Sequence, residues 1–301
     1  MSDQALAQSA LPIPEPATPV SRTLVSDQAR QVEIRPGRIA SLALAPGATH
    51  SDTTVFLVHG AGGNQDQWRE VWNELVQAGY RVLAFDFVGH GHSPKPRQAG
   101  TYRGTALVDD LRSILTTHGS RRNVVVAHSY GARLALGALL RLHDEGRADL
   151  VERAVLLGAQ SPDASFEPGP IGALPAFALE WLRPKLSRQF RAVAWSAQTD
   201  PALVEYEAGL ADRNPMHVFK SLVTQGFSPE AASLSGLALP VLVLAGDHDG
   251  LTPAAGARAL VDRLPCAELR VFEHCGHQIM LEQAVLTSRA ILGFIAAQTV
   301  A

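Results

Sequence analysis

The segment VVVAHSYGARLAL (residues 124–136) joins an apolar run to a helix-forming sequence through a single serine. Its three valines predict a buried strand, and the Ala, Arg and Leu residues after Tyr130 predict a helix. Ser129 stands at the junction, with Ala127 two residues before it and Gly131 two residues after it. Two interpretations are open: Ser129 is a nucleophile presented on a tight turn, or it is an ordinary cap of the helix that follows.

Strand-like runs and amphipathic helical segments alternate along most of the chain, which predicts an α/β protein with a parallel sheet covered on both faces. A hairpin is expected at 31–46, with Pro36 and Gly37 in its turn. Further strands are expected at 53–60, 81–86, 123–128, 154–158, 240–247 and 268–273, and helices at 64–78, 105–115, 130–142, 254–264 and 282–297.

One long segment, residues 163–237, interrupts this alternation because it contains no strand-like run. It is rich in proline and large apolar residues, which predicts a helical insertion that acts as a cap over the active site. We name Phe177, Trp181 and Phe219 as candidates for a substrate pocket, although such side chains can equally form the insertion's own core. The predicted division is a flexible N-terminal arm at 1–30, an α/β core at 31–162 and 238–301, and a cap at 163–237.

The composition limits the classes of function. The 301 residues are 46% hydrophobic and 18% charged, and the net charge is −3, which gives no electrostatic reason to expect nucleic acid as a partner. Only two cysteines are present, so a disulfide framework is not expected and the cytoplasm is the predicted compartment. The N-terminal residues lack the pattern of a signal peptide, and we expect no membrane-spanning segment. A homodimer is compatible with these features.

Three other predicted strands end in residues that could serve a nucleophilic serine. The sequences are HGAGG (59–63), GDHD (246–249) and EHCGH (273–277). The carboxyl ends of parallel strands meet at one edge of the sheet, where the chemistry of such folds takes place. The chain order is then serine, aspartate, histidine, which is the order used by the nucleophile-elbow hydrolases.

These motifs give the chain its resemblance to the capped serine hydrolases of the α/β-hydrolase fold, over roughly residues 31–301. AHSYG (127–131) resembles the elbow, although Ala127 stands where the first glycine is usual. DFVGHGHS (86–93) and the HG pair at 59–60 resemble two further loops of the family, and GDHD followed by Thr252 and Pro253 resembles the acid loop. The implied fold is a mostly parallel, eight-stranded sheet with flanking helices and a helical cap.

The resemblance also implies roles for individual residues. Ser129 is the expected nucleophile, His277 the general base and acid, and Asp249 the orienting carboxylate, with Asp247 as the alternative acid. The main-chain N–H groups of Ala61 and Tyr130 are the expected oxyanion donors. We expect no cofactor. We expect no metal either, since the His90 and His92 pair lacks acidic or cysteine partners nearby.

The predicted activity is hydrolysis of a carboxylic ester, or a thioester, with an apolar acyl or aromatic part. The alternatives on the same triad are a carbon–carbon bond hydrolase, a perhydrolase and a catalytically silent ligand-binding protein. Epoxide hydrolases and dehalogenases are disfavoured, because they carry an aspartate at the position of Ser129. A dinucleotide-binding protein is disfavoured because Gln65 occupies the position of the third glycine in its fingerprint.

Overall fold

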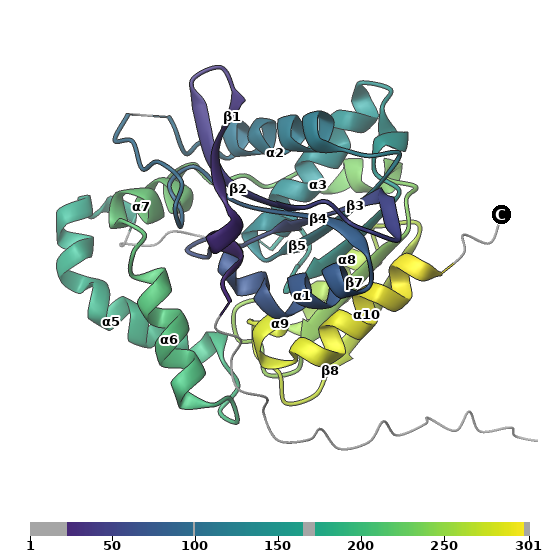
Figure 1. Cartoon of the computed structure of the whole chain (residues 1–301). Helices are drawn as coiled ribbons and strands as arrows, with labels where there is room; N and C mark the ends of the chain where they lie inside the picture. The colour runs from purple at the N-terminus through teal and green to yellow at the C-terminus, as the bar shows by residue number, and fades with distance from the viewer. Residues whose placement is uncertain (1–22, 99, 165–171, 298–301) are drawn as a thin grey trace, which may run out of the picture.

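The computed structural model describes residues 23–98, 100–164 and 172–297. Residues 1–22, which make up most of the predicted N-terminal arm, lie outside the described part of the chain. The eight strands of the sheet lie in the order β1-β2-β4-β3-β5-β6-β7-β8 (Figure 1). Their bounds are β1 (Arg30–Arg35), β2 (Arg38–Ala45), β3 (His50–Val58), β4 (Tyr80–Asp86), β5 (Arg122–His128), β6 (Arg153–Leu157), β7 (Val241–Gly246) and β8 (Ala267–Phe272).

The sheet is mostly parallel. In the described ranges the pairs β1–β2 and β2–β4 are antiparallel, whereas β3 pairs in parallel with β4 and β5, and the strands from β5 to β8 pair in parallel with one another. The strands at its centre are apolar on both faces because both faces are covered, as the Val124–Val126 run of β5 illustrates. The α/β-hydrolase fold predicted from the motifs is therefore confirmed.

Two helical layers cover the sheet and divide the core into two clusters (Figure 1). On one face lie α2 (Gly104–His118), α3 (Tyr130–Asp144) and α8 (Ala254–Val261). On the other face lie α1 (Arg69–Gln77), α9 (Ile279–Glu282) and α10 (Ala284–Ala296). None of the helices in the described ranges has the length and apolar character needed to cross a membrane.

Two of the predicted helices are interrupted. The segment expected as one helix at 64–78 begins with a 3₁₀ turn, Gln65–Trp68, which the side chain of Asn64 caps by accepting from the Asp66 N–H. The segment expected at 282–297 is split into α9 and α10 at Gln283, whose φ of −127° and ψ of 49° do not continue a helix. The Glu282 carboxylate that ends α9 accepts hydrogen bonds from the N–H groups of Ser196 and Gly276, which holds α9 against the loop after β8.

The inserted helices between β6 and β7 are α5 (Ala176–Ala194), α6 (Pro201–Ala211) and α7 (Met216–Gln225). They lie together at one side of the sheet in Figure 1. The described part of the insertion contains helices and no strand, as its sequence predicts. The domain boundaries and the role of these helices as a cap stay predictions.

Candidate active site

Ser129 lies on a strained turn between β5 and α3. Its φ is 53° and its ψ is −118°, a backbone conformation that costs a residue with a side chain about 1–3 kcal/mol. The turn is held by the Ser129 N–H, which donates to Leu157 O at 2.8 Å. The Ser129 side chain makes no hydrogen bond to cap α3. The helix-cap interpretation of this serine is therefore wrong.

Small residues are required around this turn because neighbouring main chains approach closely. A Cβ atom at Gly131 would lie 2.3 Å from His59 O, and one at Gly60 would lie 3.1 Å from the Ser129 Cβ. The HGAGG loop after β3 is thus packed directly against the elbow. Glycine at 131 is a steric requirement, whereas the alanine at 127 is accommodated as a fully buried residue of β5.

A continuous chain of hydrogen bonds runs from the serine to an aspartate. Ser129 Oγ is 2.8 Å from His277 Nε2, and His277 Nδ1 is 2.8 Å from Asp249 Oδ2. The three residues come from the loops after β5, β7 and β8, so the carboxyl edge of the sheet brings them together. The His277 N–H donates to Ala194 O at 2.7 Å, which ties this loop to the end of α5.

The Asp249 carboxylate is held by more than the histidine. Its Oδ1 accepts from the N–H groups of Leu251 and Thr252, both at 2.8 Å, and its Oδ2 accepts from the Thr252 hydroxyl at 2.6 Å. Burial acts to raise the pKa of Asp249, but the hydrogen bonds from His277 and Thr252 outweigh it and hold the pKa below its ordinary value. The carboxylate is therefore ionised at neutral pH.

Thr252 is a site residue to which the sequence assigned no role of its own. Its hydroxyl also lies 3.0 Å from Gly158 O and 3.1 Å from His277 Nδ1. Gly158, after β6, has a φ of +54°, and a Cβ there would lie 3.0 Å from His277 Cε1. The aspartate-to-threonine spacing in GDHDGLT was visible in the sequence, but the contact with Gly158 was not, because 94 residues separate the two.

Two buried histidines brace the site. His128 Nε2 lies 2.9 Å from His277 O and donates to it, and burial, assisted by the nearby His277, lowers the pKa of His128 to about 3. His59 Nε2 accepts from the Phe87 N–H at 3.0 Å, and burial lowers the pKa of His59. Both rings are therefore neutral at pH 7, and each fixes a loop of the site through a main-chain hydrogen bond.

The predicted oxyanion donors lie on the two loops that meet at Ser129. Within the described residues, neither the Ala61 N–H nor the Tyr130 N–H is hydrogen-bonded to an acceptor. The Tyr130 hydroxyl accepts from the Phe227 N–H at 3.0 Å, which connects the elbow to the segment after α7. The role of the two amides as oxyanion donors stays a prediction.

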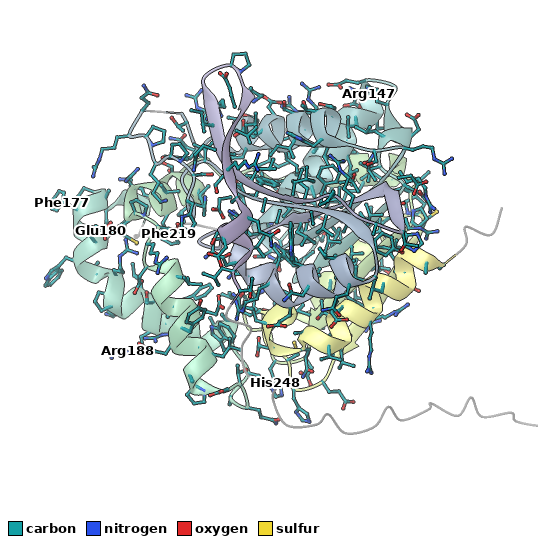
Figure 2. All side chains as sticks on the ribbon, in the orientation of Figure 1. Arg147, Phe177, Glu180, Arg188, Phe219 and His248 are labelled. Atoms are coloured by element: carbon teal, nitrogen blue, oxygen red, sulfur yellow. The ribbon has the colours of Figure 1, made fainter. Side chains whose placement is uncertain are left out.

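The remaining candidates lie outside this hydrogen-bond chain. Asp247 accepts from the Cys275 N–H through Oδ1 and does not contact His277. Phe177 and Trp181 are 78% and 83% exposed, and their place in a substrate pocket stays a prediction. Figure 2 shows Phe177 at the outer edge of the molecule. Phe219 of α7 is 37% exposed.

The chain belongs to the family described as the alpha/beta hydrolase fold, whose model matches residues 53–284. It is 30% identical over 236 residues to Protein ABHD8 of Mus musculus, a match that covers 77% of this chain and 52% of that protein. The chain thus spans about half the length of this relative. It is also 26% identical to the 2-hydroxymuconate semialdehyde hydrolase of Pseudomonas sp. (strain CF600), covering 80% of this chain and 86% of that enzyme.

A solved esterase from Exiguobacterium antarcticum has the same fold. The TM-score is 0.77 at 19% sequence identity, over 89% of this chain and 99% of that structure. Enzymes named as hydrolases or esterases thus occur in both comparisons, and this chain shares their α/β-hydrolase fold.

Proposed function

We propose that the chain is a serine hydrolase that cleaves carboxylic esters, with thioesters as a second substrate class, through Ser129, His277 and Asp249. The observation that carries the proposal is the unbroken hydrogen-bond chain from Ser129 Oγ through His277 to Asp249 Oδ2. Because Asp249 is ionised and has no proton to donate, His277 Nδ1–H donates to it. His277 Nε2 then carries the lone pair that accepts the serine proton.

The mechanism proceeds in two halves. Ser129 Oγ attacks the ester carbonyl carbon while His277 Nε2 takes the hydroxyl proton, and the carbonyl electron pair moves to the oxygen. The N–H groups of Ala61 and Tyr130 would stabilise that oxyanion. Collapse of the tetrahedral intermediate breaks the bond to the alkoxy oxygen, which leaves with the proton from His277. A water molecule, deprotonated by His277, then cleaves the acyl-enzyme and restores Ser129.

The apolar composition of the inserted helices supports a substrate with an apolar acyl or aromatic part. Phe227 follows α7 and its N–H bonds to the Tyr130 hydroxyl, so part of the insertion lies against the elbow. We expect this part of the insertion to select the acyl group, as a cap does. A homodimer and a cytoplasmic location stay predictions.

A series of p-nitrophenyl esters with acyl chains from two to twelve carbons tests this proposal. We expect wild-type turnover to rise with chain length up to the limit of the acyl site, and Ser129→Ala to abolish it. Ser235→Ala, which changes an exposed serine on the 3₁₀ helix Ala231–Gly236, is the matched control and should retain wild-type turnover. Preference for short charged esters would contradict the apolar substrate class.

Carbon–carbon bond hydrolysis is the second candidate. It is favoured by the similarity to the semialdehyde hydrolase, whose named substrate contains no ester. A chain with this activity would turn over 2-hydroxymuconate semialdehyde much faster than any p-nitrophenyl ester. Assay of both substrate classes with wild type and Ser129→Ala separates the two functions. Binding of a ligand without turnover of any class would favour the catalytically silent protein.

A further inference from the structure

Three potential metal ligands gather on the surface beside the candidate active site, outside its hydrogen-bond chain. Asp247 and His248 follow β7, and His274 lies in the turn after β8 with a φ of 55°. One ligand atom from each lies within 4.8 Å of the others, and Asp247 Oδ2 is 3.9 Å from His248 Nε2. The His248 and His274 ring centroids are 5.7 Å apart. Figure 2 shows His248 at the edge of the molecule, where an ion has access from solvent.

Each of the three side chains has a further polar contact, made by Oδ1 of the aspartate or by Nδ1 of a histidine ring. Asp247 Oδ1 accepts from the Cys275 N–H at 3.1 Å, and the His274 main-chain N–H also donates to this carboxylate. His248 Nδ1 lies 3.0 Å from Ser196 Oγ, and His274 Nδ1 lies 3.1 Å from the side-chain amide of Gln198. His248 Nε2 is thus the nitrogen that faces Asp247 Oδ2, and Nε2 is also the ring nitrogen that remains to His274 as a ligand atom. Metal-binding histidines are oriented in this way, by a polar partner on the second ring nitrogen.

Both rings can adopt the tautomer that metal binding needs. Ser196 Oγ can accept the Nδ1–H of His248, because a hydroxyl oxygen has two lone pairs. The Gln198 amide places its nitrogen toward His274, and a half-turn of this amide places Oε1 there instead, with almost no change in shape. His274 Nδ1–H would then donate to Oε1, and its Nε2 would keep a lone pair for a metal.

We propose that Asp247, His248 and His274 bind one divalent transition-metal ion, with zinc as the expected occupant. Two imidazole nitrogens and one carboxylate oxygen are the ligands that zinc accepts, and three protein ligands leave the fourth tetrahedral position for water. Zinc bonds of about 2.0–2.2 Å place tetrahedral ligand atoms about 3.4 Å apart. Exposed side chains on two loops can close the present separations by small rotations.

This site would connect the two loops that carry Asp249 and His277. Asp247 and His248 immediately precede Asp249, and His274 lies three residues before His277. Ser196 and Gln198 add the segment that follows α5. A bound ion would therefore join three segments and stabilise the edge of the sheet. Ester hydrolysis does not require it, since the proposed catalytic hydrogen bonds involve none of its three ligands.

Zinc binding to the untagged full chain, measured by isothermal titration calorimetry after treatment with a chelator, tests the proposal. We expect one equivalent of zinc to bind, and His248→Ala and His274→Ala each to weaken binding by at least about tenfold. Ser196→Ala, which removes only the orienting hydroxyl, should weaken it by about tenfold. His143→Ala, at an exposed histidine of α3, is the matched control and should bind as wild type does.

Cobalt provides a second readout, because a tetrahedral nitrogen and oxygen site gives visible absorption bands that the histidine variants should lose. Melting temperatures recorded in chelator show whether the variants fold. A fixed zinc concentration that saturates the wild type should raise the wild-type and control values by several degrees, and the values of the two histidine variants by less. Absence of stoichiometric zinc binding by the wild type would overturn the proposal. Retention of wild-type zinc affinity by either histidine variant would overturn it as well.

Discussion

The carboxyl edge of the sheet and the inserted helices differ in how firmly their side chains are held. At the edge, Asp249 accepts hydrogen bonds from three different residues, and His277 is 3% exposed. On α5, Phe177 and Trp181 are 78% and 83% exposed. The edge therefore has the pre-organisation that bond-making chemistry needs, whereas α5 leaves large apolar surface uncovered. We infer that catalysis depends on single atoms of the edge, and that α5 tolerates substitution.

The largest expected effect comes from the two aspartates of the GDHD loop. Asp249→Asn removes the charge that orients His277 and should lower kcat for p-nitrophenyl esters by about 10⁴-fold. Asp247→Asn, assayed with a chelator present, should lose less than about tenfold, because Asp247 does not contact His277. Steady-state kinetics of both variants measure the contrast. A larger loss of kcat for Asp247→Asn than for Asp249→Asn would identify Asp247 as the carboxylate that orients His277 and would contradict the assignment of Asp249.

The second effect concerns a buried ion pair between the insertion and the core. Arg69 Nη1 of α1 lies 2.6 Å from Glu207 Oε1 of α6, and both side chains are almost fully buried. Arg69→Met leaves the carboxylate buried without its partner and should lower the free energy of unfolding by about 3 kcal/mol. The double variant Arg69→Met/Glu207→Leu should recover most of this loss. Urea unfolding measures the stability of the single and the double variant, and equal stabilities would exclude a buried ion pair.

The third effect is a dependence of the free energy of unfolding on pH that originates at the carboxyl edge of the sheet. The pKa of His128 is about 3 in the folded chain, against about 6.5 in an unfolded one. Below pH 6.5 the unfolded chain binds a proton at this residue that the folded chain does not, so the free energy of unfolding falls as the pH is lowered toward 3. At pH 5 the loss from His128 alone is about 2 kcal/mol.

His128→Gln tests this dependence, because its amide can still donate to His277 O but does not titrate. Urea unfolding at pH 7.5 and at pH 5.0 should show a smaller loss of stability for the variant than for the wild type, by about 2 kcal/mol. Buried His59 and His90, whose pKa values are also lowered, contribute equally to both proteins. Identical losses in the two proteins would show that His128 is protonated in the folded chain.

The smallest effect is expected on α5. Phe177→Ser and Trp181→Ser should change the free energy of unfolding by no more than about 0.5 kcal/mol, as substitutions at exposed positions do. The kcat/KM for short p-nitrophenyl esters should change by less than about threefold. A large rise in KM that is confined to long acyl chains would show that these side chains contact the substrate, as the sequence predicts for a substrate pocket.

The candidate site residues at the carboxyl edge of the sheet could be predicted because short, local sequence motifs mark them. Ser129 and Asp249 each follow a strongly apolar strand, and Ala127 and Gly131 mark the tight turn around Ser129. His277 follows the less apolar strand β8, whose sequence AELRVF still reads as a strand. The contact of Thr252 with Gly158 could not be predicted, because it depends on how the loops after β6 and β7 meet in space.

The inserted helices were predictable as helices but not in their packing. Apolar residues in α5 indicate that a face can be buried, but they do not tell which face another element covers. Leu179 is fully buried, whereas Trp181, two residues further along, is exposed. The buried pair of Arg69 and Glu207 was equally hidden, since 138 residues separate its members. Such contacts follow from the tertiary arrangement and leave no local pattern.

The central claim, that Ser129 is a nucleophile activated by His277, is tested most directly by identifying the residue that a fluorophosphonate modifies. Wild type, Ser129→Ala and His277→Ala would be treated with the probe, and intact mass and peptide mapping would locate the adduct. The account predicts one adduct per chain on Ser129, no adduct in Ser129→Ala and much slower labelling in His277→Ala. An adduct on another residue, or no adduct on the folded wild type, would contradict it.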